Sequence, residues 1–395
     1  MIAIFQVIGK PDSYQEVEYL VGGRVIRARV SGRAVSMMLG EGSRLFLLAP
    51  ESVENGSVEE FARENEAKLL WVPAYHSSGD GCCLEVIVTS ILLHMLEEEP
   101  EELYVDVSTG LNVYTVALVE AARRYLTYSR LRGIVQNRKG AEVKMISSSP
   151  VINKSQRVST EIEGMEVKAF FSYPEVRIGE VLRGSENREL YVRLKGILKE
   201  LRIAYNALRL NVPLTFYTPE VLSLDEDIGE VMKELKGVLR IKIEQGGNFS
   251  GKEVAKVFYA LAMYHSLQEF MHGLTEPEVE EIKRVFLDTY RIDSLGIGSN
   301  TFFLTRDLEE LKNLGEELEE GEEETLQKLR ERKRECGGGA GGSTDRKRNF
   351  FAHSGLLREY TVVRKEGGKL FLRWRTEGEA GKEVVREIRR WLLSP

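Results

Sequence analysis

An arginine and a histidine stand near the C-terminus with four residues between them, in the run RNFFAH from Arg348 to His353. Histidine is the side chain whose ordinary pKa lets it give or take a proton near neutral pH. Arginine binds phosphate groups through paired donors. With Asn349 beside them, the two residues could act on a phosphate ester, although the spacing alone also fits a histidine that is simply packed or solvated.

A helix is expected to carry this motif, from the basic run at Arg346 through Leu357. On a helix Asn349 and His353 share one face. Arg348 lies about 140° around the helix axis from His353, and its long side chain would bring the guanidinium back towards the imidazole. The glycine-rich stretch from Gly337 to Ser343 reads as a flexible linker before it. The acidic and basic segments after Leu318 are expected to form a solvated helix.

A second candidate site follows the predicted strand that starts at Leu103. The strand ends in small polar residues and leads directly into a long amphipathic helix. Backbone N–H groups and hydroxyls at such a helix N-terminus can bind a phosphate, although the same residues could merely cap the helix. The candidate ligand residues here are Asp106, Ser108, Thr109, Gly110 and Asn112.

The N-terminal half alternates predicted strands and helices, which indicates a parallel, doubly wound α/β sheet. Ile2 to Ile8 is a nearly continuous apolar run, typical of a strand covered on both faces. Its carboxyl end leads into a turn-rich loop with Gly9, Lys10 and Ser13. Open α/β sheets bind ligands at the carboxyl ends of their strands, so these three residues join the candidate ligand site.

The C-terminal half changes to a helical period. A long core-facing helix is expected from Glu186 to Leu210, and capping boxes at Ser250 and Thr275 predict two more helix starts. A hairpin around Gly367-Gly368 and a last amphipathic helix follow the Arg348 motif. The sequence therefore predicts an α/β domain over 1–178 and a helical domain over 179–395.

Composition narrows the possible functions of the chain. Its 395 residues favour two domains, and no signal peptide or membrane span is evident, so a cytoplasmic protein is expected. The net charge of −7 argues against stable DNA binding. Three cysteines without metal-ligand spacing predict neither a metal site nor disulfides. Neither a dinucleotide-binding fingerprint nor a P-loop is present.

The order of these features resembles the CARF–HEPN ribonucleases that accompany type III CRISPR systems. The resemblance rests on the Gly9 to Tyr14 loop, the turn from Asp106 to Asn112 and the Arg348 to His353 motif. It implies a Rossmann-like CARF domain that binds a cyclic oligoadenylate, with cyclic tetra-adenylate expected first and the hexa-adenylate second. It further implies that this ligand activates a HEPN endoribonuclease in antiviral defence.

The resemblance also assigns roles to the candidate residues. His353 would be general base or acid, Arg348 would stabilise charge on the phosphorane, and Asn349 would orient the phosphate or the imidazole. Cleavage of single-stranded RNA would use the 2′-hydroxyl as nucleophile and need no metal or other cofactor. In the family two HEPN domains pair, so a homodimer is expected. Two copies of the Ser108 turn would then match the ring's symmetry, with Lys10 and Ser13 on phosphate or ribose and Asn112 on a base edge.

Three alternatives stay open at this stage. The chain could be a ligand-sensing CARF-type regulator without nuclease activity, but a DNA-binding helix-turn-helix is not evident after the motif. It could be a small-molecule enzyme built on the α/β half. The CARF site could also cleave its own ring slowly, assisted by Lys10, Ser108 and Thr109.

Overall fold

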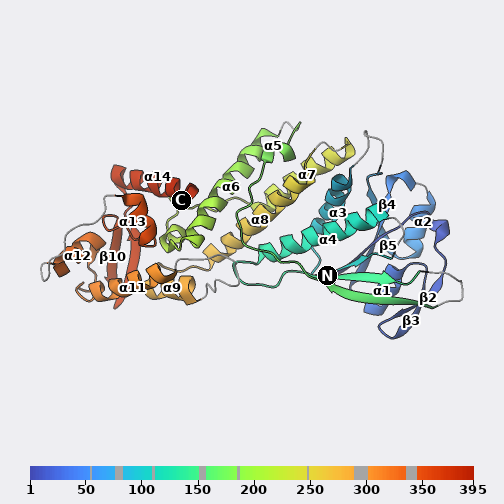
Figure 1. Ribbon diagram of the computed structural model, residues 1–395, viewed down its shortest axis with the longest axis horizontal. Helices are drawn as coiled ribbons and strands as arrows, with labels where there is room; N and C mark the ends of the chain where they lie inside the picture. Colours follow the sequence, from blue (N-terminus) through green and yellow to red (C-terminus); the bar gives the residue numbers. More distant parts are fainter. Residues whose placement is uncertain are drawn as a thin grey trace.

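A computed structural model describes residues 1–395 except 54–55, 76–82, 109–111, 151–156, 185–186, 247–248, 289–300 and 335–344. The molecule is elongated (Figure 1). A large β-sheet with its helices lies at one end, long helices fill the middle, and a smaller group of helices with a second sheet lies at the other end.

Eight described strands form the large sheet, in the order β3-β2-β8-β7-β6-β1-β4-β5. Strands β5, β4, β1, β6 and β7 run parallel to one another. The strands span β1 Ile2–Val7, β2 Val17–Val21, β3 Arg24–Ala28, β4 Ser43–Pro50, β5 Ala67–Val72, β6 Glu102–Asp106, β7 Glu142–Ser148 and β8 Arg157–Met165.

The central strand β1 shows why the sheet is covered on both faces. Ala3, Phe5 and Val7 belong to the apolar cluster under α3 (Leu84–Glu98) and α4 (Asn112–Arg132). Ile4 instead belongs to the cluster under α1 (Ser31–Leu39) and α2 (Gly56–Glu64). Because side chains alternate between the two faces of a strand, the continuous apolar run is buried on both sides, as the sequence predicts.

The prediction of a parallel sheet is correct for the centre and wrong for one edge. Strand β8 runs antiparallel to β7, and β2 and β3 form an antiparallel hairpin at the margin. The turn of this hairpin is Gly22-Gly23, with φ of 54° and 79°. Such a two-residue turn with positive φ favours a hairpin, so the edge of the sheet is mixed.

Long helices connect the sheet to the rest of the chain. They are α6 (Arg188–Arg209), α7 (Ile228–Glu244) and α8 (Gly251–His272), preceded by the short α5 (Ile178–Val181). Helix α8 packs against α3, α4 and α6. Its predicted cap is confirmed, because Ser250 Oγ accepts a hydrogen bond of 3.3 Å from the Glu253 amide. One apolar cluster runs from the sheet through these helices to the C-terminal helix.

The C-terminal part surrounds a described three-stranded sheet in the order β11-β10-β9. Its strands are β9 (Glu323–Thr325), β10 (Thr361–Glu366) and β11 (Lys369–Trp374), the last two forming the predicted hairpin around Gly367-Gly368. Its helices are α9 (Val279–Lys283), continued by a π-helix over Arg284–Asp288, then α11 (Thr301–Gly315), α12 (Leu326–Arg334), α13 (Arg346–Ala352) and α14 (Gly378–Leu393).

Two local predictions in this part are wrong. The helix predicted after Thr275 does form from Val279 as α9, but its N-cap is Glu278 and not Thr275. The Leu372 amide donates to the Pro277 carbonyl and Glu278 pairs with Phe371, so the chain runs beside β11 before the helix starts. The solvated helix predicted after Leu318 is interrupted by β9, which completes the small sheet. In both places pairing with a distant strand overrides the local pattern.

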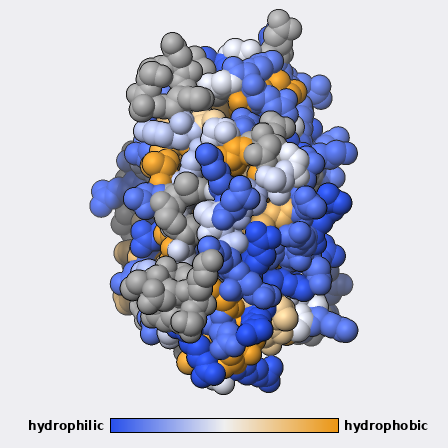
Figure 2. Space-filling model, turned by 90° about the vertical axis from the view of Figure 1, so that its right-hand side faces the viewer, coloured by the Kyte–Doolittle hydropathy of each residue, from blue (hydrophilic) through white to orange (hydrophobic). Residues whose placement is uncertain are grey.

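The surface at the sheet end of the molecule is largely hydrophilic, with small separate hydrophobic patches (Figure 2). Among the helices that the structure describes, none has the length and hydropathy to cross a lipid bilayer.

Candidate functional site

The sheet brings the two predicted ligand loops together. Strands β1 and β6 are neighbours and run parallel, with Gln6 opposite Asp106. Their carboxyl ends therefore lie at the same edge of the sheet, and the loops that start at Gly9 and Ser108 leave from adjacent positions. This is the edge at which open α/β sheets bind ligands.

Asp106 lies beneath this edge and not on it. Its carboxylate is 0% exposed and accepts hydrogen bonds from Ser31 Oγ at 2.6 Å and from the Ser108 amide at 2.8 Å. Burial raises the pKa of Asp106, and these hydrogen bonds act in the opposite direction. Gln6 Nε2 donates to Ser31 Oγ at 3.2 Å and extends the network. In this structure Asp106 supports the loop, which is a different role from the expected ligand contact.

Three other predicted ligand residues face solvent. Lys10 and Ser13 are exposed in the first loop, and Asn112 is exposed as the first residue of α4. The first loop is held in shape by a 2.6 Å hydrogen bond from Ser13 Oγ to the Lys10 carbonyl. The Gly9 amide is buried and donates to the Tyr14 hydroxyl at 3.0 Å. Thr109 and Gly110, also predicted to bind the ligand, lie outside the described residues.

The Arg348 motif lies on α13, which is shorter than predicted. The Asp345 side chain caps its start by accepting from the Arg348 amide at 3.0 Å. The helix ends at Ala352 and not at Leu357, because Ser354 and Gly355 adopt φ of 48° and 82°. The Gly355 amide bonds back to the Phe350 carbonyl at 2.8 Å, which is a Schellman ending. His353 is therefore the C-terminal cap of the helix.

This ending still keeps the motif residues together. The His353 amide donates to the Asn349 carbonyl at 3.0 Å, so the last helical hydrogen bond joins two of the three predicted catalytic residues. Arg348 is exposed, and its guanidinium forms neither an ion pair nor a hydrogen bond with the described part of the chain. The guanidinium is thus available to an anion from outside.

A buried carboxylate holds the His353 ring. His353 Nδ1 lies 3.2 Å from Oδ2 of Asp307 on α11, and Asp307 is only 2% exposed. An ionised carboxylate can only accept a hydrogen bond, so Nδ1 carries the proton and Nε2 of the neutral ring is left free to accept one. The other carboxylate oxygen, Oδ1, accepts from Arg306 Nη2 at 3.1 Å. The ring is oriented as a general base requires.

Comparison with known families decides the identity of the chain. Residues 3–150 match the CARF domain, and residues 299–377 match the HEPN domain, of the CRISPR system endoribonuclease Csx1. The chain belongs to the CARF–HEPN endoribonuclease family. None of the curated proteins compared with the chain matches it.

Membership indicates a CRISPR-associated ribonuclease with a ligand-sensing domain and an RNA substrate. The match to the CARF model contains all the predicted ligand residues, and the match to the HEPN model contains Arg348, Asn349, His353 and Asp307. Residues 151–298 lie in neither match, so the domain boundary at 178/179 stays a prediction.

Asp307 is the residue of the HEPN domain that sequence reasoning missed. A signal was present in α11, where Leu304, Leu308 and Leu311 form a buried helical stripe and Asp307 falls on the same face. A carboxylate on an apolar face requires a partner. The sequence does not show that this partner would be a histidine 46 residues further along the chain.

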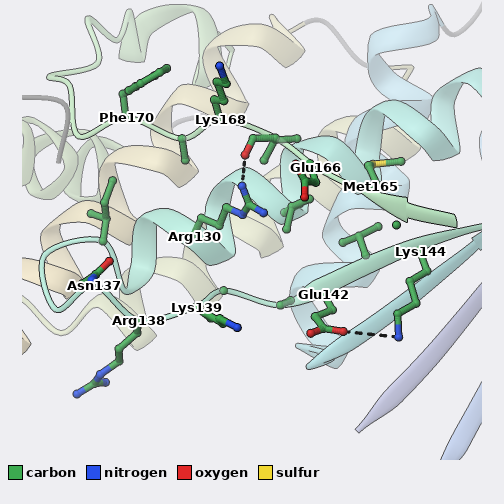
Figure 3. Close-up of a pocket in the computed structure, with 18 residues that line it drawn as sticks. Arg130, Asn137, Arg138, Lys139, Glu142, Lys144, Met165, Glu166, Lys168 and Phe170 are labelled. Atoms are coloured by element: carbon green, nitrogen blue, oxygen red, sulfur yellow. Dashed lines mark hydrogen bonds and ion pairs between the residues drawn. The ribbon is translucent and has the colours of Figure 1, made fainter. Parts of the chain in front are cut away.

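The CARF domain also has a hollow at the opposite edge of its sheet (Figure 3). This cavity of about 660 Å³ lies beside the start of β7 and the end of β8. Arg130 reaches from α4 to the backbone oxygen of Val167, and Lys144 lies 3.6 Å from Glu142. The cavity is therefore separate from the candidate ligand loops, and Arg130 ties the segment that leaves β8 to α4.

Proposed function

We propose that this protein is a cyclic-oligoadenylate-activated endoribonuclease that cleaves single-stranded RNA without a metal ion and works as a homodimer. The observation that carries the proposal is the hydrogen bond between His353 and buried Asp307, at the end of an Arg-x4-His helix within the HEPN match. A histidine held by a carboxylate is suited to proton transfer.

The reaction uses a nucleophile that RNA itself supplies. The 2′-hydroxyl of a nucleotide attacks the adjacent phosphorus, and the bond from phosphorus to the 5′-oxygen of the next nucleotide breaks. His353 Nε2 takes the proton from the 2′-hydroxyl, and a second acid protonates the leaving 5′-oxygen. The products are a 2′,3′-cyclic phosphate and a free 5′-hydroxyl, so atoms and charges balance. Arg348 stabilises the extra negative charge on the phosphorane.

A second copy of the chain completes the site. The reaction benefits from one group that removes a proton and one that delivers a proton, and each chain contributes one histidine of this kind. Two HEPN domains related by a dyad would place two His353 rings in one cleft. The dyad would also place two CARF loops side by side, which suits a ring of repeated nucleotides.

Helix α4 connects the candidate ligand site with α8, so a movement at the ligand site can be transmitted towards the catalytic site. Its first residue is Asn112 at the candidate ligand edge, and the loop beyond its last turn contacts α8. There the Val135 amide donates to Ser266 Oγ at 3.1 Å, and Gln136 donates to the Ser266 carbonyl at 2.5 Å. Halfway along, Arg124 is buried against Glu85, which lies 3.0 Å away. A ligand that shifts α4 would therefore shift α8, which leads towards the HEPN part.

The test is an RNA cleavage assay in EDTA, with no ring or with cyclic tri-, tetra- or hexa-adenylate. The parent protein should cleave faster with one ring size, tetra-adenylate first, and leave 2′,3′-cyclic phosphate ends. The His353→Ala variant should lose cleavage and keep ring binding. Cleavage that needs magnesium, that persists in His353→Ala, or that ignores every ring would overturn the corresponding part of the proposal.

A further inference from the structure

A basic groove lies between α6 and α14. Its volume is about 440 Å³, and it is lined by Lys199, Arg386, Arg389, Arg390, Leu393 and Ser394. Four of these six residues are cationic, with neither an acidic nor an aromatic residue in the lining. In a chain of net charge −7 such a concentration of positive charge is local. It predicts an anionic partner.

Ion pairs within the protein neutralise only part of this charge. Arg389 is held by Glu200 and donates to the Val221 carbonyl at 2.7 Å, so its role is to join the two helices. Lys199 and Arg386 are exposed and have no ion pair with the described residues. These two cations are therefore available to a ligand.

The charges form two rows and not a compact pocket. Lys195 and Lys199 are one helical turn apart on α6, and Arg386 and Arg390 are one turn apart on α14. The helices are tied along their length, because Asn206 Nδ2 donates to the Leu392 carbonyl at 2.6 Å. Two rows of cations beside a groove fit an extended polyanion better than a small anion, which needs donors that converge.

The groove opens beside the catalytic helix. Lys347 Nζ donates to the carbonyl of Ser394, a lining residue, at 2.7 Å. Lys347 directly precedes Arg348 in the first turn of α13. The same helix packs on α14 through Phe350 and Trp391, whose ring centres are 5.3 Å apart. A strand bound at Arg348 can continue over Lys347 into the groove.

We infer that the groove between α6 and α14 binds the sugar–phosphate backbone of the single-stranded RNA beside the bond that is cleaved. This inference rests on the proposed ribonuclease function. Because none of the described residues that line the groove is aromatic, bases do not stack there. Binding is then electrostatic, independent of base sequence and sensitive to salt.

The test compares the double variant Lys199→Gln/Arg386→Gln with the control Lys233→Gln/Lys252→Gln. The control removes two exposed cations of α7 and α8 that do not line the groove and have no ion pair with the described residues. Cleavage is measured with a 20-nucleotide RNA and with a trinucleotide, at saturating ring activator and several salt concentrations. Thermal unfolding checks that both variants fold.

For the long RNA, the groove variant should raise KM about tenfold without a matching fall in kcat, because two backbone contacts are lost. The slope of log KM against log salt should decrease by about 1.4, since each single-strand phosphate contact contributes roughly 0.7. The trinucleotide should show no such change, and the control variant should match the parent.

Three results separate the inference from the proposed function. If the parent cleaves RNA but the groove variant keeps its KM and salt slope, the groove is not the RNA site and the nuclease proposal stands. If KM rises equally for the trinucleotide, the cations act at the reacting phosphate and the inference is wrong. If the parent does not cleave RNA under any condition, the proposed function itself fails.

Discussion

Replacing Asp307 by Asn tests whether the carboxylate orients His353 for catalysis. The substitution keeps the size of the side chain but can place an amide N–H against His353 Nδ1, which favours the wrong tautomer of the ring. The lost interaction is a hydrogen bond to a charged group, worth about 1.5–3 kcal/mol. If this hydrogen bond contributes its full free energy only in the transition state, when the ring accepts a proton, kcat should fall about 10- to 150-fold. KM for RNA should stay near the parent value, since Asp307 is 2% exposed and out of reach of substrate.

The assay is initial-rate cleavage of a fluorescent RNA at saturating activator, with thermal unfolding measured in parallel. Arg306→Gln is the control, because it removes the other partner of the same carboxylate, at 3.1 Å, and leaves the contact to His353. Its kcat should stay within about threefold of the parent, because the Arg306 side chain is 48% exposed and the hydrogen bond that orients His353 is kept. A normal kcat in Asp307→Asn would refute the orienting role. Equal losses in both variants would show that the carboxylate acts only through folding.

Three further predictions concern stability. Gly355→Ala should lower the free energy of unfolding by about 2–5 kcal/mol in urea titrations, because φ is 82° and the new Cβ would lie 2.4 Å from Val212; a loss under 1 kcal/mol would contradict this. Ser31→Ala should cost about 1–3 kcal/mol, because buried Asp106 loses a donor, and an unchanged urea midpoint would refute it. Burial first, and then the nearby guanidinium groups of Arg132 and Arg138, lower the pKa of His265 below its ordinary value of 6.5. The unfolded chain therefore binds this proton near pH 6.5 while the folded chain does so only at lower pH, so stability should fall as pH drops through 6.5. His265→Gln should flatten that part of the pH–stability curve, and an unchanged slope would contradict the assignment.

The elements that sequence reasoning places correctly are those in which local pattern and burial agree. Strand β1 is a buried apolar run, and α8 begins at the predicted N-cap Ser250. The hairpin at Gly367-Gly368 is fixed by glycines with φ of 60° and 72°. In each of these segments the residues that decide the structure are neighbours in the chain, so one sequence is sufficient.

The predictions are wrong where contacts between segments far apart in the sequence determine the local structure. Strand β9 forms because it pairs with β10. The contact between Glu278 and Phe371 moves the helix N-cap from the predicted Thr275 to Glu278. The position of Asp106 at the end of a strand predicts a ligand residue, whereas in the structure its carboxylate is buried and accepts a hydrogen bond from Ser31 of α1. The carboxylate that contacts His353 belongs to Asp307 on α11, and the spacing of these residues along the chain does not predict that contact.

The apolar cluster that starts at Ala3 and ends at Leu392 passes through both predicted domains. A sensor and a nuclease that share one core cannot melt separately, so calorimetry should record a single cooperative transition across the whole chain. Cutting at the predicted boundary of 178/179 would expose the faces of α3 and α4 that α8 covers. A chimera with another sensor would therefore have to exchange these helices together with α8, which ties the evolution of ligand recognition to that of the nuclease scaffold.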